Sequence, residues 1–402
     1  MASTQSASIN DMGDPLRPYV PVNETPEEKR KRINLEKQAK KRSDAIDKQL
    51  KAEREEKDKQ KTAKLLLLGS SESGKTTVLK QLKIIHGQGL SDERQRYRRI
   101  VHLNVLTAIK ALANALTALG YPIKPENKQH LDRIVNLSTI KNTLNRNSIT
   151  VQAAIRDQQL DDNSQDLFME NINSVIALWN DPAIKQCYNS ASEIGLQDSA
   201  KYFLDNVGRF GKDNYLPTDE DILQARIRTV GVAEHRFEIA DVIYRIFDVG
   251  GHRSQRHFWA PYFDDVNAII FMAAISAFDQ TLEDSDINRM DDSIQLFEEI
   301  CNNPLMINTH IILFLNKIDI LKHKLEDVKV KVNDYFPEYQ GDNKFQSVSK
   351  FFQRKFLSRN NNDEKHIYVH FTHATDTKQM RVIVASVNDI VQRMNLKASG
   401  LI

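Results

Sequence analysis

The first residues whose types and spacing could do chemistry form the stretch GSSESGKT, from Gly69 to Thr76. The stretch fits the pattern G-x-x-x-x-G-K-[ST] and lies between the apolar run KLLLL and the helical pattern VLKQLKIIH. Backbone N–H groups of such a loop, together with the N-terminus of the helix that follows, cradle phosphate groups. Lys75 could reach the outer phosphates, and the hydroxyl of Thr76 could bind Mg²⁺. The stretch therefore predicts a site for a nucleoside triphosphate.

A second motif, NKID, follows the apolar run HIILFL and ends at Asp319. A fixed carboxylate can accept both the N1 and the N2 protons of guanine, a pair of donors that adenine does not offer. By itself the tetrapeptide could equally be a solvated turn, but its place at a strand end, behind a phosphate loop, favours a guanine site. In FTHAT, the backbone N–H of Ala374 could meet the guanine carbonyl. These residues disfavour an ATP-dependent kinase.

Between these motifs lies DVGGH, from Asp248 to His252. Asp248 would hold Mg²⁺ through water, and the N–H of Gly251 would meet the terminal phosphate. Glycine suits that position because the backbone must approach the phosphate closely. The next residue, His252, stands where a water that attacks the phosphate would be held.

Short apolar runs must position these motifs as buried strands. The run KLLLLG comes first, and from residue 238 onward IYRIFDV, AIIFMAAI, HIILFL and IYVHFT alternate with helical segments. This alternation indicates a doubly wound, mostly parallel sheet in an α/β domain. Residues 88–220 differ, because RRIVHLNVLTAIKALANALTAL and DLFMENINSVIALWN carry apolar residues at helical spacing. We therefore expect an all-helical insert in the α/β domain.

Composition limits the class of protein. The chain has 402 residues, 40% hydrophobic and 27% charged, with a formal net charge of +2. This balance gives no reason to expect nucleic acid as a partner. The two cysteines, Cys187 and Cys301, lack metal-ligand spacing and are expected to be free thiols in a reducing compartment. No uninterrupted apolar run approaches the roughly 20 residues of a membrane span, so we expect a soluble intracellular protein.

The N-terminal region has its own composition. Residues 1–26 are rich in Ser, Asn, Pro and Asp and are expected to be disordered. Residues 27–64 are densely charged, with more basic than acidic side chains and a thin apolar stripe that includes Leu35 and Ile46. This pattern predicts a helix that is either simply solvated or bound along its stripe to a partner.

The ordered set GSSESGKTT, DILQARIRTVGV, DVGGHRSQRHFW, NKID and THAT resembles the alpha subunit of heterotrimeric G proteins. The resemblance covers roughly residues 42–402 and includes the helical insert. It implies a Ras-like P-loop GTPase domain over residues 64–87 and 221–402, and an inserted all-helical domain over residues 88–220. Residues 1–63 would form the disordered start and the N-terminal helix.

The resemblance also implies residue roles. Arg226 would be a built-in arginine finger, and Glu72 would pair with it when the terminal phosphate is absent. Thr76, Thr229 and Asp248 would hold Mg²⁺. Asp198 is either a nucleotide contact or an ordinary helix cap. The residues expected to contact GTP or GDP are Glu72, Ser73, Gly74, Lys75, Thr76, Thr77, Asp198, Ser199, Leu223, Arg226, Thr229, Asp248, Gly251, Asn316, Lys317, Asp319 and Ala374.

Partners follow from the same resemblance. The N-terminal helix, Arg256 and Trp259 would contact a G protein beta-gamma dimer, and the C-terminal stretch IVQRMNLKASGLI would contact a G protein-coupled receptor. The effector is not identified. The start MASTQS lacks the residues that carry the usual lipids, so we expect a cytoplasmic protein held at the inner face of the plasma membrane through its partners.

Several residues depart from the family pattern, among them Val230 in place of a threonine and Ser399 in place of a cysteine. Ser71 replaces a glycine of the phosphate loop, His252 replaces the glutamine that orients the attacking water, and His373 replaces a cysteine, with little expected effect. Arg226 and His252 remain the candidate catalytic residues. Two hypotheses stay open: a signalling GTPase with slow hydrolysis, and a GTP-binding interaction protein with little or no hydrolysis.

Overall fold

The computed structural model describes residues 25–59, 61–87, 89–137, 163–189, 195–227, 229, 231–239, 242–282, 285–307 and 309–398. The chain forms two compact units, Met1–Lys61 and Thr62–Ile402. Most of the expected disordered start and the last residues of the expected receptor-binding tail lie outside the described residues.

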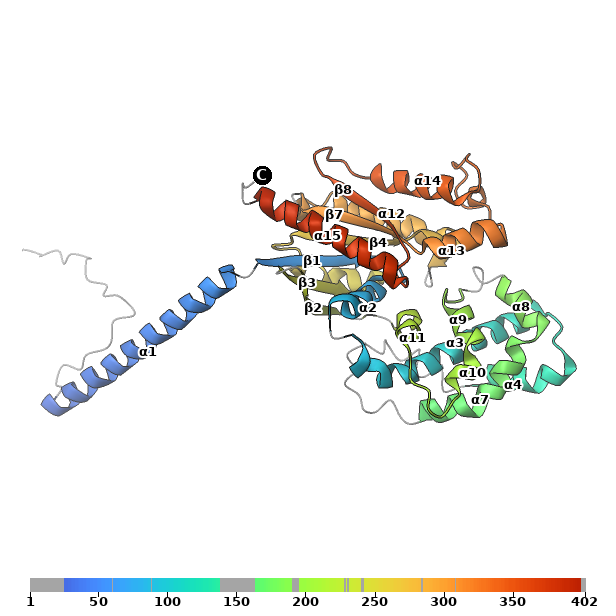
Figure 1. The fold of residues 1–402 in the computed structure, drawn as a ribbon, viewed down its shortest axis with the longest axis horizontal. Coiled ribbons are helices and arrows are strands. Elements are labelled where there is room, and N and C mark those ends of the chain that lie inside the picture. The colour runs from blue at the N-terminus through green and yellow to red at the C-terminus, as the bar shows by residue number, and fades with distance from the viewer. Residues whose placement is uncertain are drawn as a thin grey trace, which may run out of the picture. The chain divides into compact units, whose positions relative to one another are not determined.

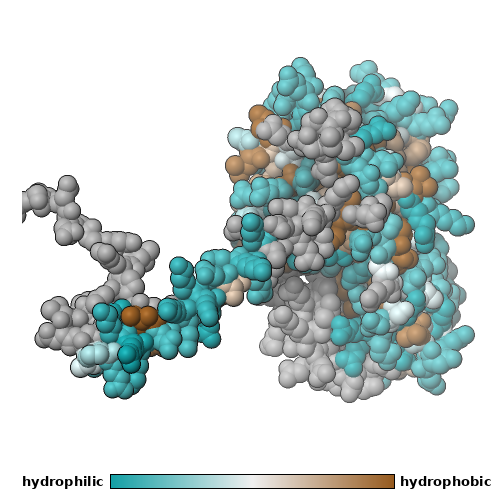
Figure 2. Space-filling model, turned by 60° about the vertical axis from the view of Figure 1, so that its left-hand side comes forward, coloured by the Kyte–Doolittle hydropathy of each residue, from teal (hydrophilic) through white to brown (hydrophobic). Residues whose placement is uncertain are grey.

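The first unit contains one long helix, α1 (Pro26–Lys59). Pro26 occupies its first turn, and Glu28 accepts hydrogen bonds from the backbone N–H (2.9 Å) and hydroxyl (2.7 Å) of Thr25, which caps the N-terminus. The side chains of Leu35 and Ile46 are 66% and 52% exposed. Figure 2 shows that the visible face of α1 is mostly hydrophilic with a small apolar patch.

The second unit contains a six-stranded sheet in the order β2-β3-β1-β4-β7-β8 (Figure 1). Strands β1 and β4, β4 and β7, and β7 and β8 pair in parallel, whereas β2 and β3 are antiparallel. This topology confirms the doubly wound, mostly parallel α/β class. The strands are β1 (Lys61–Gly69), β2 (Val232–Ile239), β3 (Val242–Val249), β4 (Ala268–Ala274), β7 (His310–Asn316) and β8 (Ile367–Thr372).

Two details of the strands differ from expectation. Strand β1 begins at Lys61, three residues earlier than its apolar run, and β2 was missed. Because β2 is an edge strand, its sequence VAEHRFEI carries exposed charged residues and lacks the apolar run of a central strand. A two-stranded ribbon, β5 (Thr281–Leu282) with β6 (Ser285–Asn288), was missed as well.

Helices cover both faces of the sheet, and each face has its own apolar core. On one face, Phe271 packs with Phe297 and Phe356 from two helices. On the other, Val78 and Val384 pack in a second core beside the strands. The helices of this domain are α2 (Lys75–His86), α12 (Arg289–Cys301), α13 (Ile318–His323), α14 (Phe345–Leu357) and α15 (Thr377–Ala398).

The insert is all-helical in its described residues and has a third core, which extends from Leu90 to Ala225. Because Ile222 and Ala225 are buried in that core, the helical part continues a few residues beyond the expected boundary at residue 220. Its helices are α3 (Arg94–Leu119), α4 (Lys128–Val135), α7 (Asn163–Trp179), α8 (Pro182–Asn189), α9 (Ala200–Asp205), α10 (Val207–Phe210) and α11 (Asp219–Gln224).

The central helix of this insert is long and rich in apolar residues. By length and composition, Ser91–Leu119 could cross a membrane. The window that qualifies is 72% buried inside the protein, because its apolar side chains form the core of the helical domain.

Helix α11 ends at the segment that carries Arg226, and a buried carboxylate anchors it. Asp221 accepts hydrogen bonds from Arg209 (2.6 and 2.7 Å) and Tyr202 (2.6 Å), and Thr218 completes a capping box with it. Burial opposes ionisation, but these hydrogen bonds lower the pKa of Asp221 to about 2. The charged carboxylate therefore ties α11 to α9 and α10.

His102 should make the helical domain less stable in mild acid. Its ring is buried and stacks on Phe168 at 4.1 Å, and burial lowers its pKa to about 4 against the opposing bond with the Phe210 carbonyl. The unfolded chain binds the proton near pH 6.5, so stability is full above that pH and falls as the pH drops toward 4. From pH 7 to 5 we expect a loss of about 2 kcal/mol.

Hydrogen exchange of α3 amides at several pH values measures this loss. His102→Gln should flatten the pH dependence, and the control His130→Gln, on α4, should not. If the stability of His102→Gln falls with pH as steeply as that of the wild type, other groups cause the loss.

Candidate functional site

The loop after β1 turns sharply into α2. Gly74 precedes α2 with φ +105°, a conformation that favours glycine, and Asn316 donates to the Ser73 carbonyl at 2.8 Å. Lys75, the first residue of α2, donates to the carbonyls of Gly69 (2.9 Å) and Ser70 (2.7 Å). Burial lowers the pKa of Lys75 to about 8, although nearby Asp248 opposes the shift. The loop and the ammonium group together suit an anionic ligand.

The oxygen atoms of three side chains, Thr76, Thr229 and Asp248, lie close together beside this loop. The hydroxyls of Thr76 and Thr229 lie 2.8 Å apart, and Thr76 donates to one oxygen of Asp248 at 3.1 Å. The other oxygen of Asp248 is buried without a hydrogen-bond partner among the described residues. Burial raises the pKa of Asp248 to about 6, against the attraction of Lys75. A buried carboxylate oxygen without a partner, beside two hydroxyls, fits the hard oxygen ligands that Mg²⁺ prefers.

One cavity of about 670 Å³ lies between the sheet domain and the helical domain. Apart from Asp248, which is buried beneath it, every residue expected to contact nucleotide lines this cavity. Gly251 packs so tightly against the loop that a Cβ there would lie 2.3 Å from Lys75 Nζ and 2.6 Å from the Ser70 carbonyl oxygen. Lining residues that the sequence reasoning did not name include Lys80, Gln197, Tyr202, Gln255 and Thr375.

Glu72 lies between two arginines at one end of the cavity. It forms an ion pair with Arg226, and Arg289 lies 3.0 Å from its other oxygen. Burial opposes ionisation, but the two arginines lower the pKa of Glu72 overall. Arg289 also donates to the Ser71 carbonyl at 3.0 Å. No local pattern around Arg289 pointed to this role, because its partners lie 217 and 218 residues away.

The opposite end of the cavity is built by the ends of β7 and β8. Asn316 accepts from the backbone N–H of Ala374 (3.1 Å). Lys317 forms a 2.5 Å ion pair with Asp198 of the helical domain. Burial raises the pKa of Asp198, but Lys317 outweighs it and brings the value to about 2. Ser199, and not Asp198, occupies the cap position of α9, so Asp198 is not an ordinary helix cap.

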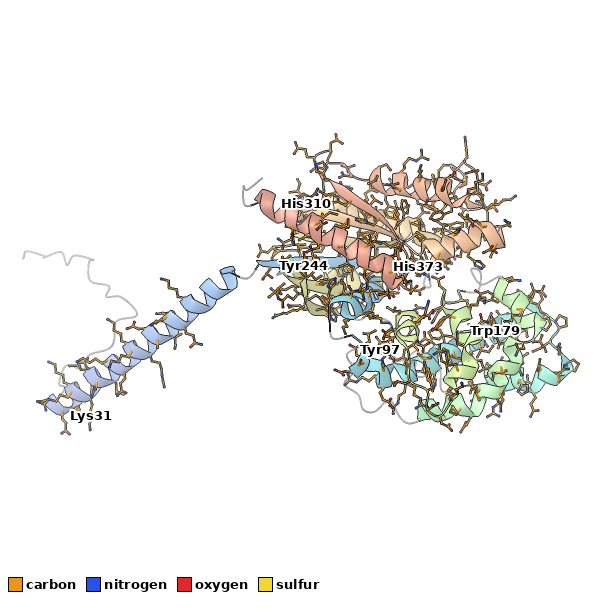
Figure 3. All side chains as sticks on the ribbon, viewed as in Figure 1. Lys31, Tyr97, Trp179, Tyr244, His310 and His373 are labelled. Atoms are coloured by element: carbon orange, nitrogen blue, oxygen red, sulfur yellow. The ribbon has the colours of Figure 1, made fainter. Side chains whose placement is uncertain are left out.

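The side chain of His373 also lies at this end of the cavity. Its Nε2 lies 3.2 Å from a carboxylate oxygen of Asp319 and 2.8 Å from the Thr375 hydroxyl. Figure 3 places His373 and His310, the first residue of β7, at opposite ends of the sheet. The expectation of little effect considered only the backbone, whereas the imidazole contacts the carboxylate thought to select guanine.

His252 lines the cavity and begins a 3₁₀ helix, Arg253–Phe258. Its Nδ1 lies 2.9 Å from the Ser254 hydroxyl and accepts from the Ser254 N–H at 3.4 Å. A neutral imidazole whose Nδ1 accepts carries its proton on Nε2. In this conformation Nδ1 is therefore engaged by Ser254 and is not available to accept from a water.

The two residues expected to contact a partner, Arg256 and Trp259, are both held by bonds within the sheet domain. Trp259 is 3% exposed and donates to the Gly250 carbonyl at 3.1 Å. Arg253 and Arg256 lie 2.8 and 2.5 Å from the carboxylate of buried Asp292 on α12. These pairs hold the 3₁₀ segment against the sheet domain.

Comparison with known proteins identifies the family. The family model described as G-protein alpha subunit matches residues 40–391. The chain is 40% identical to a guanine nucleotide-binding protein subunit alpha of Emericella nidulans and 41% identical to a G-protein complex alpha subunit of Aspergillus fumigatus. Each match spans 342 residues, 84% of this chain and 90% of the relative. A guanine nucleotide-binding protein alpha-1 subunit of Mycosarcoma maydis is 39% identical over the same coverage.

Members of that family are in general GTPases that bind guanine nucleotides and typically Mg²⁺. They signal with beta-gamma dimers, receptors and effectors as partners. The phosphate loop, the Ras-like sheet and the helical insert described above agree with this architecture. The chain therefore belongs to the family of G-protein alpha subunits.

Proposed function

We propose that this chain binds GTP and GDP with Mg²⁺ in the 670 Å³ cavity and acts as a signalling switch with slow GTP hydrolysis. The convergence of three motifs on one cavity carries the proposal: the Gly69–Thr76 loop, the oxygen cluster of Asp248, and Asp319. We divide the chain into a Ras-like domain, residues 64–87 and 221–402, and an inserted helical domain, residues 88–220. The packed core of the helical domain extends to Ala225.

Each end of the cavity takes one end of the nucleotide. Backbone N–H groups of Glu72–Thr77 and the Lys75 ammonium bind the phosphates. Thr76, Thr229 and Asp248 would hold Mg²⁺, which neutralises phosphate charge when bound. The remaining contacts are assigned to Asp198, Ser199, Leu223, Gly251, Asn316, Lys317, Asp319 and Ala374.

Hydrolysis requires charge stabilisation and an oriented water. Arg226 is held by Glu72 in this structure and would turn to the terminal phosphate to neutralise transition-state charge. His252 is poorly suited to orient the water, because its Nδ1 already accepts from Ser254. This bond favours slow hydrolysis, and it also supports the second candidate function, a GTP-binding interaction protein with little hydrolysis.

Binding of the beta-gamma dimer would depend on whether the segment around Arg256 and Trp259 keeps its ion pairs with Asp292. We assign the beta-gamma dimer to α1 and to this segment once its pairs with Asp292 have opened. The exposed apolar side chains Leu35 and Ile46 support a partner along α1. The C-terminal end of α15 and the residues after it are assigned to the receptor.

The nucleotide carried by the purified chain tests this function. We expect stoichiometric guanine nucleotide after denaturation and chromatography, and slow release of phosphate in a single turnover of added GTP. Lys75→Ala should purify without nucleotide, since it removes the buried ammonium group. Adenine nucleotide in the wild-type chain would contradict the proposal.

The basic helix α1 should attract anionic membranes. Electrostatic attraction contributes about 1 kcal/mol per well-placed Lys or Arg and is screened by salt. We expect binding to vesicles that contain phosphatidylserine at low ionic strength, and release as the salt concentration rises. A variant that exchanges Lys40, Lys41 and Arg42 for Gln should bind less. Salt-resistant binding of both chains would show that charge on α1 is not the cause.

A further inference from the structure

The backbone of Arg226 is bonded on both sides by one side chain of the helical domain. The carboxamide of Asn104, on α3, accepts from the Arg226 N–H at 3.1 Å and donates to the Arg226 carbonyl at 3.3 Å. The two bonds agree on the orientation of the amide, because a flipped amide would face donor with donor and acceptor with acceptor. Asn104 is 6% exposed, so these bonds lie out of water.

Asn104 is itself held in place. Its amide nitrogen also donates to the Ile100 carbonyl of the same helix at 2.7 Å. The carboxamide is thus fixed to α3 at one side and to Arg226 at the other. A planar group with one donor and one acceptor restrains both position and rotation of the peptide that it meets.

The residues just before Arg226 are held from the other domain. Lys80, on α2, donates to the carbonyls of Ile222 and Ala225, both at 2.8 Å. Lys80 belongs to the helix that the phosphate loop begins, and it is 4% exposed. The segment that carries Arg226 is therefore restrained from both domains at the point where its backbone reaches the cavity.

A restrained backbone matters for an arginine that must move only its side chain. The guanidinium of Arg226 pairs with Glu72 in this structure, whereas its proposed catalytic position is at the terminal phosphate. If the backbone drifts, the guanidinium misses the developing charge, and an error of about 1 Å can cost about 100-fold in rate.

We propose that Asn104 is a positioning residue for GTP hydrolysis, which fixes the backbone of Arg226 so that its side chain reaches the transition state. The inference rests on the proposed role of Arg226. It assigns to the helical domain a direct part in the hydrolysis step, through one carboxamide.

Single-turnover GTP hydrolysis by the full chain tests the proposal. Asn104→Ala should slow hydrolysis about tenfold and leave the affinity for a non-hydrolysable GTP analogue within about twofold. Asn104→Asp keeps the size and the acceptor but places an oxygen against the Arg226 carbonyl, so it should also be slow. Asn171→Ala is the matched control, because Asn171 is also buried, donates to the Leu167 carbonyl of its own helix, accepts from Arg133 and does not line the cavity.

A double-mutant cycle identifies the route of the effect. Arg226→Ala should slow hydrolysis at least about 100-fold, and Asn104→Ala should then add less than about twofold. If Arg226→Ala leaves the rate unchanged, the proposed role of Arg226 fails. If Arg226→Ala is slow but Asn104→Ala is not, or costs the same tenfold in both backgrounds, the positioning role is overturned.

Discussion

Asp319→Asn weakens GTP binding by about 100-fold and gives the protein affinity for xanthosine triphosphate. The carboxylate of Asp319 lines the base end of the cavity and is proposed to accept two guanine protons. An amide there offers a donor in place of one acceptor, and a donor facing a donor costs about 3 kcal/mol when water is excluded. Xanthine has a carbonyl where guanine has its amino group, so the amide meets an acceptor again.

Competition binding with GTP, XTP and ATP measures this change of specificity. Asp327→Asn is the control, because Asp327 lies in the helical turn Lys324–Val328 that follows α13, is 69% exposed and pairs with His323. It should leave all three affinities unchanged. Unchanged GTP affinity in Asp319→Asn would remove the NKID motif from the base site.

His252→Gln raises the single-turnover rate of GTP hydrolysis. G-protein alpha subunits with their arginine in cis hydrolyse GTP at about 10⁻² s⁻¹, and we expect this chain to be at least tenfold slower, about 1.4 kcal/mol in barrier. A glutamine amide can accept from the water and donate to the phosphate, whereas the Nδ1 of His252 is engaged by Ser254. Combining His252→Gln with Ser71→Gly should recover more than the product of the single effects, since both residues line the same cavity.

The rate is measured in a single turnover of the full chain for the wild type, His252→Gln and the double variant with Ser71→Gly. His257→Gln is the matched control, as His257 lies on the same exposed 3₁₀ segment but does not line the cavity. A wild-type rate near 10⁻² s⁻¹ that drops in His252→Gln would make histidine the working catalyst.

The sequence by itself determined the family, the sheet and the main outline of the site. The apolar runs predict central strands because they are buried on both faces, and the phosphate-loop pattern is local: Gly74 supplies the positive φ and Lys75 begins the helix. The motifs follow β1, β3, β7 and β8, and the carboxyl ends of parallel strands share one edge of a sheet. The structure brings all of them to one cavity or directly beneath it.

The tertiary structure alone decided which side chains complete that site. Arg289 reaches Glu72 across 217 residues, and Asn104 reaches Arg226 across 122. It also placed the His373 ring against Asp319 and buried Trp259 in the apolar core of the sheet domain. Periodicity and motif spacing report only near neighbours along the chain. Such partners are set by how the helical insert and the sheet pack together, which no local pattern encodes.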